Sequence, residues 1–312
     1  MKMVSRNVSD SQVQTTDLPK GVSALRALPS PKLDKLWESI VVDDTIKTQL
    51  LAQAVLNFTI RGKVDRSVLP LHGVILLVGP PGTGKTSLAR GLASRVAGAL
   101  NTGDCKLLEI DPHALTSSAM GKTQRAVADL FSQTVAEQAS SGRTIVLLDE
   151  VETLAADRSK MSLEANPIDI HRATDAVLVQ LDLLAESHPN LLFVATSNFP
   201  QAVDAAFTSR CDLVLKVPLP DAAALKQILI DCLGGLAESY PALRPLVDSR
   251  DLPKLASVCV GLDGRAVRKM VINGLAMRKE TALDPSKLTM NDLLTAASAA
   301  RINRTADEGV RA

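Results

Sequence analysis

Residues 79–87 constrain the fold of this chain most tightly, because a glycine-rich run there separates an apolar segment from a helical one. The run reads Gly79-Pro80-Pro81-Gly82-Thr83-Gly84-Lys85-Thr86-Ser87, which matches G-x-x-x-x-G-K-[ST], and residues 74–78 before it are all apolar. A strand, this loop and a helix, in that order, surround phosphate oxygens with backbone N–H groups at a helix N-terminus. Lys85 is expected to reach the β- and γ-phosphates, and Thr86 to offer its hydroxyl to Mg²⁺. The run therefore predicts a nucleotide site.

Acidic and amide side chains follow two later apolar runs. Asp149 and Glu150 come directly after residues 145–148, and Asn198 comes just after residues 191–195. Open parallel sheets hold their ligands at the carboxyl ends of the strands, so Asp149 is expected to hold the hydration shell of Mg²⁺ there. Glu150 is then positioned to orient and deprotonate the attacking water, and Asn198 to hydrogen-bond that water or the γ-phosphate. The pair of acids favours hydrolysis over nucleotide binding alone.

Short apolar runs alternate with helical patterns up to residue 218. The predicted strands are 74–78, 106–110, 144–148, 191–196 and 213–217, and the predicted helices between and before them are 44–58, 85–100, 122–138 and 169–185. This alternation predicts an α/β domain with a parallel sheet covered by helices on both faces.

Only helical patterns follow residue 218, namely 222–232, 252–260, 264–279 and 289–300, and Gly234-Gly235 is expected to end the first of them. The predicted organisation is a flexible N-terminal arm over residues 1–32, an α/β domain over 33–218 and a small all-helical domain over 219–312.

The composition excludes several classes of protein. The 312 residues carry 35 Lys+Arg against 34 Asp+Glu, a net charge of +1, and aromatic residues make up 2%. Nucleic-acid binding is not expected, because there is neither a net positive charge nor a supply of aromatic rings to stack on bases. The sequence shows no signal peptide and no membrane span, which predicts a cytoplasmic protein without a membrane partner. The four cysteines and four histidines lack metal-ligand spacing.

Together these motifs resemble those of the AAA+ ATPases. Residues 79–86 resemble the Walker A motif, residues 145–150 the Walker B motif and Asn198 the sensor-1 residue. By the same resemblance Arg210 is the arginine finger, which reaches the γ-phosphate bound by a neighbouring subunit, and Arg265 is the sensor-2 residue of the helical lid. The resemblance implies ATP and Mg²⁺ as ligands and a homo-hexameric ring.

Several stretches narrow the resemblance to the pachytene-checkpoint type of AAA+ ATPase, which remodels HORMA-domain proteins. They are residues 36–41, 79–88, 148–158, 169–182 and 196–198. In that family Val41 and Val42 would flank adenine. The resemblance implies that the ring pulls on a HORMA-domain protein and disassembles its closed complex. The small size points to the bacterial branch, which accompanies cyclic-oligonucleotide synthases in CBASS anti-phage defence.

Two features depart from that family. Only about 35 residues precede the ATPase core, too few for the additional N-terminal domain of the eukaryotic relatives. The first pore loop, which carries an aromatic pair in the family, reads Ala119-Met120-Gly121-Lys122 here, and a second pore loop is expected at residues 158–168. Met120 can supply a flexible apolar contact, with the grip on substrate weaker or shared with Lys122.

Two other readings remain open from the residues. One is an AAA+ ATPase acting on nucleic acid, such as a helicase or clamp-loader subunit, and the positive charges of Lys122 and Arg125 near the pore favour it. The other is a nucleotide-gated binding module that barely hydrolyses ATP, and the presence of Glu150 and Arg210 argues against it. Stimulation of turnover by DNA would favour the first, and negligible turnover with tight ATP binding the second.

Overall fold

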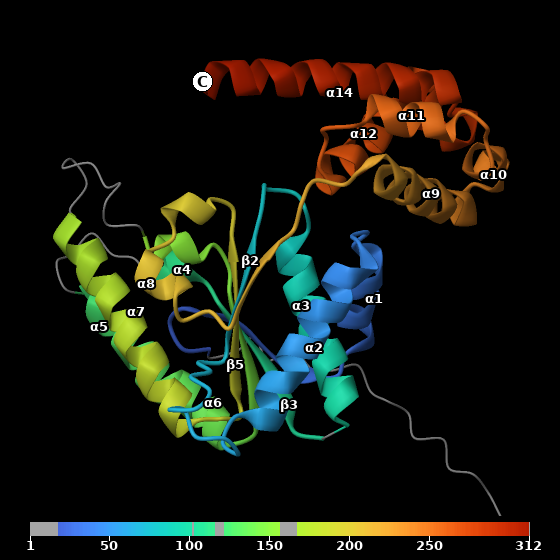
Figure 1. Ribbon diagram of the computed structural model, residues 1–312. Helices are drawn as coiled ribbons and strands as arrows, with labels where there is room; N and C mark the ends of the chain where they lie inside the picture. The colour runs from blue at the N-terminus through green and yellow to red at the C-terminus, as the bar shows by residue number, and fades with distance from the viewer. Residues whose placement is uncertain (1–17, 102, 116–121, 157–166, 312) are drawn as a thin grey trace, which may run out of the picture. The chain divides into compact units, whose positions relative to one another are not determined.

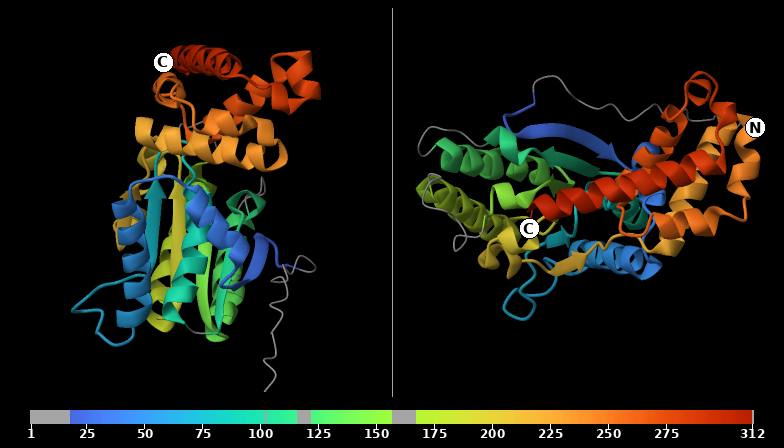
Figure 2. Two further views of the ribbon diagram at one scale, coloured as in Figure 1. Left: turned by 90° about the vertical axis from the view of Figure 1, so that its right-hand side faces the viewer. Right: turned by 90° about the horizontal axis from the view of Figure 1, so that it is seen from above.

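The chain divides into two compact units, seen here in a computed structural model that describes residues 18–101, 103–115, 122–156 and 167–311. Unit 1 comprises Met1–Ser39, Thr45–Val78 and Thr86–Lys216. Unit 2 comprises Ile40–Asp44, Gly79–Lys85 and Val217–Ala312. Figures 1 and 2 show the chain in three views.

Unit 1 contains all the named strands and the helices up to α8. The strands are β1 (Val22–Leu28), β2 (Val74–Val78), β3 (Cys105–Ile110), β4 (Arg143–Leu148), β5 (Leu191–Ser197) and β6 (Leu213–Lys216). The helices are α1 (Pro31–Ser39), α2 (Asp44–Ile60), α3 (Lys85–Leu100), α4 (Pro112–Leu115), α5 (Lys122–Asp129), the π-helix η1 (Leu130–Val135), α6 (Ala136–Ser140), α7 (Pro167–Ser187) and α8 (Ala205–Thr208), with short 3₁₀ turns η2 (Val151–Thr153) and η4 (Pro200–Ala202).

The strands form one six-stranded sheet in the order β1-β3-β4-β5-β2-β6. Every neighbouring pair is parallel except β1–β3. Figure 1 shows α2 and α3 on one face of the sheet and α5, α6 and α7 on the other. The core that covers the second face includes Phe131 and Phe193, whose rings stack with centroids 5.8 Å apart. The α/β prediction is therefore confirmed, with five of the six strands found where the sequence predicted them.

The strand β1 was not predicted, and the expectation of a flexible arm over residues 1–32 is wrong for residues 22–28. This strand pairs antiparallel with β3. Ala24 and Leu28 are buried, and Arg26 donates to the buried carboxylate of Glu109 at 2.8 Å. Within the strand only Ala24 and Leu28 are buried, so its sequence has no regular alternation that would predict a strand.

Unit 2 is helical after residue 217. Its helices are α9 (Ala222–Ser239), α10 (Arg244–Val247), α11 (Leu252–Val258), α12 (Gly264–Ala276), α13 (Lys279–Leu283) and α14 (Met290–Arg311), with 3₁₀ turns η5 (Pro241–Leu243) and η6 (Pro285–Lys287). Asp221 caps α9, accepting from the N–H of Ala224 at 2.8 Å. None of the described helices in either unit has the length and apolarity to cross a membrane.

The expectation that Gly234-Gly235 ends the first helix of unit 2 is wrong, because α9 continues to Ser239. Each glycine costs a helix interior roughly 1 kcal/mol relative to alanine. Beyond them Ala237 is buried in the core of unit 2, against which Leu236 also packs. Burial of this last turn in the core of unit 2 offsets the weak helix propensity of the two glycines.

Candidate functional site

The register of the sheet brings the polar ends of β4 and β5 together. Leu148 pairs with Ala195, so the next residues, Asp149 and Thr196, lie side by side at the carboxyl edge of the sheet. The parallel strand β2 ends at the same edge, where Val78 pairs with Ser197. The structure therefore gathers at one edge the strand ends that the sequence singled out.

The Asp149 carboxylate lies between two threonine hydroxyls of unit 1. Its Oδ1 accepts from Thr86 Oγ1 at 2.8 Å and from Thr196 Oγ1 at 2.5 Å. Thr86 stands in the first turn of α3, and Thr196 stands in β5. A carboxylate and hydroxyls are hard oxygen ligands of the kind that Mg²⁺ takes directly or through water. The residues present thus fit a divalent cation.

Glu150 has a backbone conformation that is unusual for a residue with a side chain. Its φ is 52° and its ψ 56°, in the left-handed region, and its N–H donates to Thr196 Oγ1 at 3.1 Å. Non-glycine residues held in this region cluster at functional sites, because the strain is tolerated where the side chain must point in a set direction. The strained backbone turns the Glu150 side chain out of the strand.

Both oxygens of the Glu150 carboxylate are held from other elements. Asn198 Nδ2 donates to Oε1 at 3.0 Å, and His113 Nε2 of α4 lies 3.3 Å from Oε2. The Glu150 side chain remains 48% exposed. The carboxylate is therefore oriented and still open to a reactant.

A cavity of about 210 Å³ adjoins these carboxylates within unit 1. Asp149, Glu150, His113 and Arg90 are among the residues that line it. Arg90 is tied down by the buried Glu109, which accepts from its Nε at 2.9 Å. The lining of the cavity thus combines the two carboxylates of Asp149 and Glu150 with the guanidinium of Arg90, which Glu109 holds in place.

The glycine-rich loop, residues 79–85, belongs to unit 2. Lys85 is buried, and its Nζ donates to the carbonyls of Gly79 and Pro80, both at 2.8 Å. Gly82 has a φ of +80°, and a Cβ there would collide with the Asp263 carboxylate. Only glycine fits this position without strain.

The start of α12 lies against the same loop within unit 2. Asp263 caps α12, accepting from the N–H of Ala266 at 2.9 Å. The N–H of Arg265 is 3.4 Å from the Gly82 carbonyl, and the Arg265 side chain is exposed. The backbone of Arg265, the residue predicted as sensor-2, therefore lies next to the glycine-rich loop.

Val41 and Val42 line a pocket of about 690 Å³ in unit 2. Pro218, Leu219 and Pro220 form another wall of it. Small-molecule sites are concave and lined mainly by apolar groups of this kind. The residues fit the base of a nucleotide.

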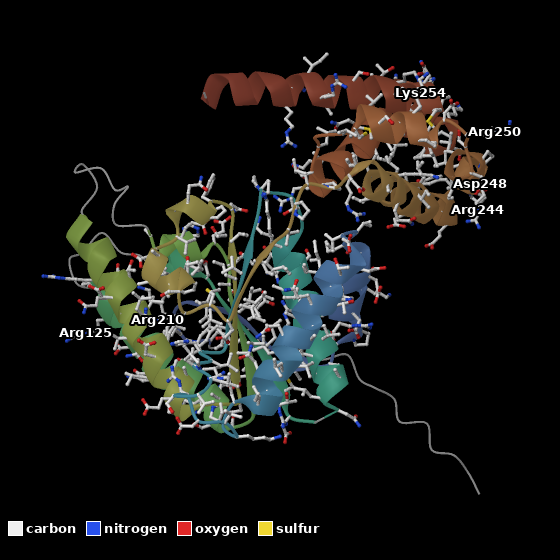
Figure 3. All side chains as sticks on the ribbon, in the orientation of Figure 1. Arg125, Arg210, Arg244, Asp248, Arg250 and Lys254 are labelled. Carbon is white, nitrogen blue, oxygen red and sulfur yellow. The ribbon has the colours of Figure 1, made fainter. Side chains whose placement is uncertain are left out.

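Arg210 lies between α8 and β6, beside α7 (Figure 3). It forms a two-pronged ion pair with Asp182 of α7, with Nη2 2.7 Å from Oδ2. This contact raises the pKa of Arg210 and lowers the pKa of Asp182.

The predicted pore loops are only partly described. Ala119, Met120 and Gly121 lie outside the described residues, as do residues 158–166 of the second loop. Lys122 is described as the exposed first residue of α5.

Sequence reasoning missed three residues that the structure brings to these groups: Thr196, His113 and Asp182. The Thr196 position follows from the pairing of Leu148 with Ala195, so a correct register would have found it. No spacing signals His113 or Asp182, since each meets its partner only through the packing of separate elements.

Comparison with known proteins places these observations in a family. The profile of the AAA family, described as ATPase family associated with various cellular activities, matches residues 75–219. CD-NTase-associated protein 6 of Pseudomonas aeruginosa is 66% identical over 279 residues, covering 89% of this chain and 92% of that protein. The pachytene checkpoint protein 2 homolog of Danio rerio is 33% identical and covers 86% of this chain and 68% of that protein.

The chain spans 59% of one pachytene checkpoint relative, from Oryza sativa, and 68% of the Danio rerio protein. A similar fold occurs in a solved structure described as "Structure of E. coli MS115-1 HORMA:CdnC:Trip13 complex". The TM-score is 0.71 at 17% identity, covering 88% of this chain and 94% of that one.

Proposed function

We propose that this chain, which belongs to the AAA ATPases of the pachytene checkpoint protein 2 type, couples ATP hydrolysis to the partial unfolding of a HORMA-domain protein. The observation that carries the hydrolytic half is the Glu150 carboxylate, held by Asn198 and His113 beside the Asp149–Thr86 pair. A module that only bound nucleotide would not need an oriented, exposed carboxylate at that position.

Each residue has a role in the proposed reaction. The loop from Gly79 to Ser87 holds the phosphates, with Lys85 neutralising the charge that develops on them, and Val41 and Val42 hold the base. Thr86 and, through water, Asp149 would hold Mg²⁺, which would supply positive charge to the phosphates. Glu150 takes a proton from the attacking water, and Asn198 orients that water.

Two arginines complete the proposed site. Arg265 contacts the phosphates from the helical unit, or lid, of the same subunit. The loss of phosphate on hydrolysis therefore changes the position of the lid. Arg210 comes from the neighbouring subunit of a homo-hexameric ring. A planar, permanently charged guanidinium suits both positions, because its N–H groups match phosphate oxygens.

The proposed substrate is a HORMA-domain protein in its closed, partner-bound state. The HORMA protein named in the complex with a similar fold supports this substrate, and the name of the Pseudomonas relative supports an association with a CD-NTase. We further propose that a cyclic-oligonucleotide synthase is regulated in this way, as part of CBASS anti-phage defence. The loops at residues 116–123 and 158–168 would grip an N-terminal segment of the HORMA protein, with Met120 and Lys122 as contacts.

Steady-state ATP turnover tests this function. It is measured alone, with single- and double-stranded DNA, and with a HORMA-domain protein plus its bound partner, with Glu150→Gln as the blank. We expect acceleration by the HORMA complex and none by DNA. Acceleration by DNA alone would show that the pore handles nucleic acid, and turnover at the level of the blank in every condition would leave only a nucleotide-gated module.

A further inference from the structure

Three N–H groups of the Arg210 guanidinium are fixed within its own subunit. Nε donates to Asp182 Oδ1 at 2.9 Å, Nη2 donates to Asp182 Oδ2 at 2.7 Å, and Nη1 donates to the Ala206 carbonyl at 2.8 Å. A bidentate arginine–carboxylate pair sets the plane of the guanidinium as well as its place. The Arg210 side chain is only 25% exposed.

The backbone beside Arg210 is anchored independently. Two residues on, the Asp212 carboxylate accepts from the N–H groups of His72, Gly73 and Val74, at 2.8, 2.7 and 3.1 Å. The N–H of Asp212 donates in turn to the Val74 carbonyl at 2.7 Å. Asp212 thus ties the turn that carries Arg210 to the beginning of β2, while Asp182 ties its side chain to α7.

The carboxylate leaves part of the guanidinium available. Asp182 occupies the edge formed by Nε and one N–H of Nη2. A guanidinium has five N–H groups, and two of those on Nη1 and Nη2 have no partner among the described residues. These are the groups that can donate to the oxygens of a phosphate.

We propose that Asp182 is a positioning residue for ATP hydrolysis: it holds Arg210 in the orientation in which its remaining N–H groups meet the phosphate bound by the next subunit. The inference rests on the proposed function, in which Arg210 acts on a neighbour. His72 Nε2 also lies 3.6 Å from Asp182 Oδ1. An arginine that is oriented before assembly loses less conformational freedom when it binds phosphate.

The test combines single variants with mixed rings. We expect Asp182→Ala to lower kcat about 10- to 100-fold with little change in the KM for ATP, because a misplaced group is felt mainly in the transition state. The matched control is Glu186→Ala, which removes an exposed carboxylate one turn further along α7 and is expected to leave both constants unchanged. If the alanine variant does not assemble, Asp182→Asn is used in its place, because asparagine keeps the shape of the side chain.

Mixing with Glu150→Gln subunits separates positioning from structural damage. A Glu150→Gln subunit cannot hydrolyse ATP, but it offers its neighbour an intact, positioned Arg210. In a random 1:1 ring about half of the Asp182→Ala subunits have such a neighbour, so we expect each Asp182→Ala subunit to regain about half of the wild-type turnover. Arg210→Ala mixed in the same way should recover equally.

The outcomes of these experiments test the positioning role of Asp182 separately from the proposed function on which it rests. Recovery of Arg210→Ala without recovery of Asp182→Ala overturns the positioning role and leaves the function standing. An unchanged kcat in Asp182→Ala overturns it too. Failure of both mixtures shows that Arg210 does not act on a neighbour, which contradicts the proposed assembly and the inference together.

Discussion

At the scale of single residues, one threonine hydroxyl organises both acids of the site. Thr196 Oγ1 donates to Asp149 Oδ1 and accepts from the N–H of Glu150. A hydroxyl can do both at once because it carries one proton and two lone pairs. The contact holds the strained Glu150 backbone in place, so the direction of the proposed base depends on a residue that takes no part in proton transfer.

Replacing this hydroxyl should therefore impair catalysis without removing a reacting group. We expect Thr196→Val, which keeps the shape of the side chain, to lower kcat by about 10- to 100-fold, the equivalent of a lost hydrogen bond to a charged group. Thr196→Ser keeps the hydroxyl and should stay within about threefold of wild type. Steady-state kinetics measure both variants, and a loss in Thr196→Ser together with a wild-type kcat in Thr196→Val would show that packing of the methyl group matters instead.

The residues at this scale were predictable to different degrees. The motifs identify Lys85, Thr86, Asp149, Glu150 and Asn198, because a phosphate site needs those groups near a loop that follows a strand. The sequence contains no sign of the left-handed conformation of Glu150, nor of the His113 contact. Both depend on how α4 and β5 pack around the end of β4.

At the scale of elements, the glycine-rich loop depends on space that only glycine leaves. A methyl group at Gly82 would meet the Asp263 carboxylate that caps α12, at a φ of +80°. We expect Gly82→Ala to raise the Kd for ATP by about tenfold or more, since strain of this kind costs about 1–3 kcal/mol. The measurement is equilibrium binding of a fluorescent ATP analogue.

The control for that variant is Gly98→Ala, within α3, where a Cβ meets nothing within 4 Å. Alanine at such a helical position is expected to stabilise the fold by about 0.5–1 kcal/mol and to leave ATP binding unchanged. Similar effects of the two substitutions on the Kd would refute the role given to Asp263 and the loop.

The beginning of α14 carries an acid whose charge stabilises unit 2. The Asp292 carboxylate accepts from Arg278 at 2.9 and 2.7 Å, and this contact lowers the pKa of Asp292 from 3.8 to about 2. The unfolded chain therefore binds this proton more tightly than the folded one. The stabilisation is complete above about pH 4 and is lost as the pH falls toward 2.

Thermal unfolding across pH measures this contribution. We expect Asp292→Asn to lower the Tm at pH 7, with the difference from wild type shrinking as the pH falls from about 4 to 2. Asp248→Asn, an exposed aspartate of the same unit (Figure 3), should change the Tm little. A constant difference between wild type and Asp292→Asn at all pH values would contradict the ion pair as its source.

Most elements were predictable because apolar runs bounded by turns report buried strands well. Two of the exceptions share a cause, since β1 and the end of α9 are stabilised by partners distant in sequence. Glu109 holds β1 through Arg26, 83 residues away. The core of unit 2 holds the end of α9 past two glycines. Local propensity is a weak guide where tertiary contacts decide.

At the scale of the whole molecule, the two units carry complementary halves of the proposed chemistry. The catalytic acids lie in unit 1, whereas the glycine-rich loop, the pocket at Val41 and Val42, and Arg265 lie in unit 2. The chain is continuous between them at Lys85 and Thr86. The proposed reaction thus draws on residues of both units, and a P-loop engine takes its specific function from the partner on which it acts.

The most direct test of the account is the release of a fluorescent partner peptide from a closed HORMA-domain protein. Fluorescence anisotropy is followed after adding the full chain and Mg²⁺–ATP, with the Glu150→Gln variant as control. The account predicts a fall in anisotropy that needs both ATP and Glu150. An anisotropy that stays constant while ATP is hydrolysed, or falls equally with the Glu150→Gln variant, would contradict remodelling driven by hydrolysis.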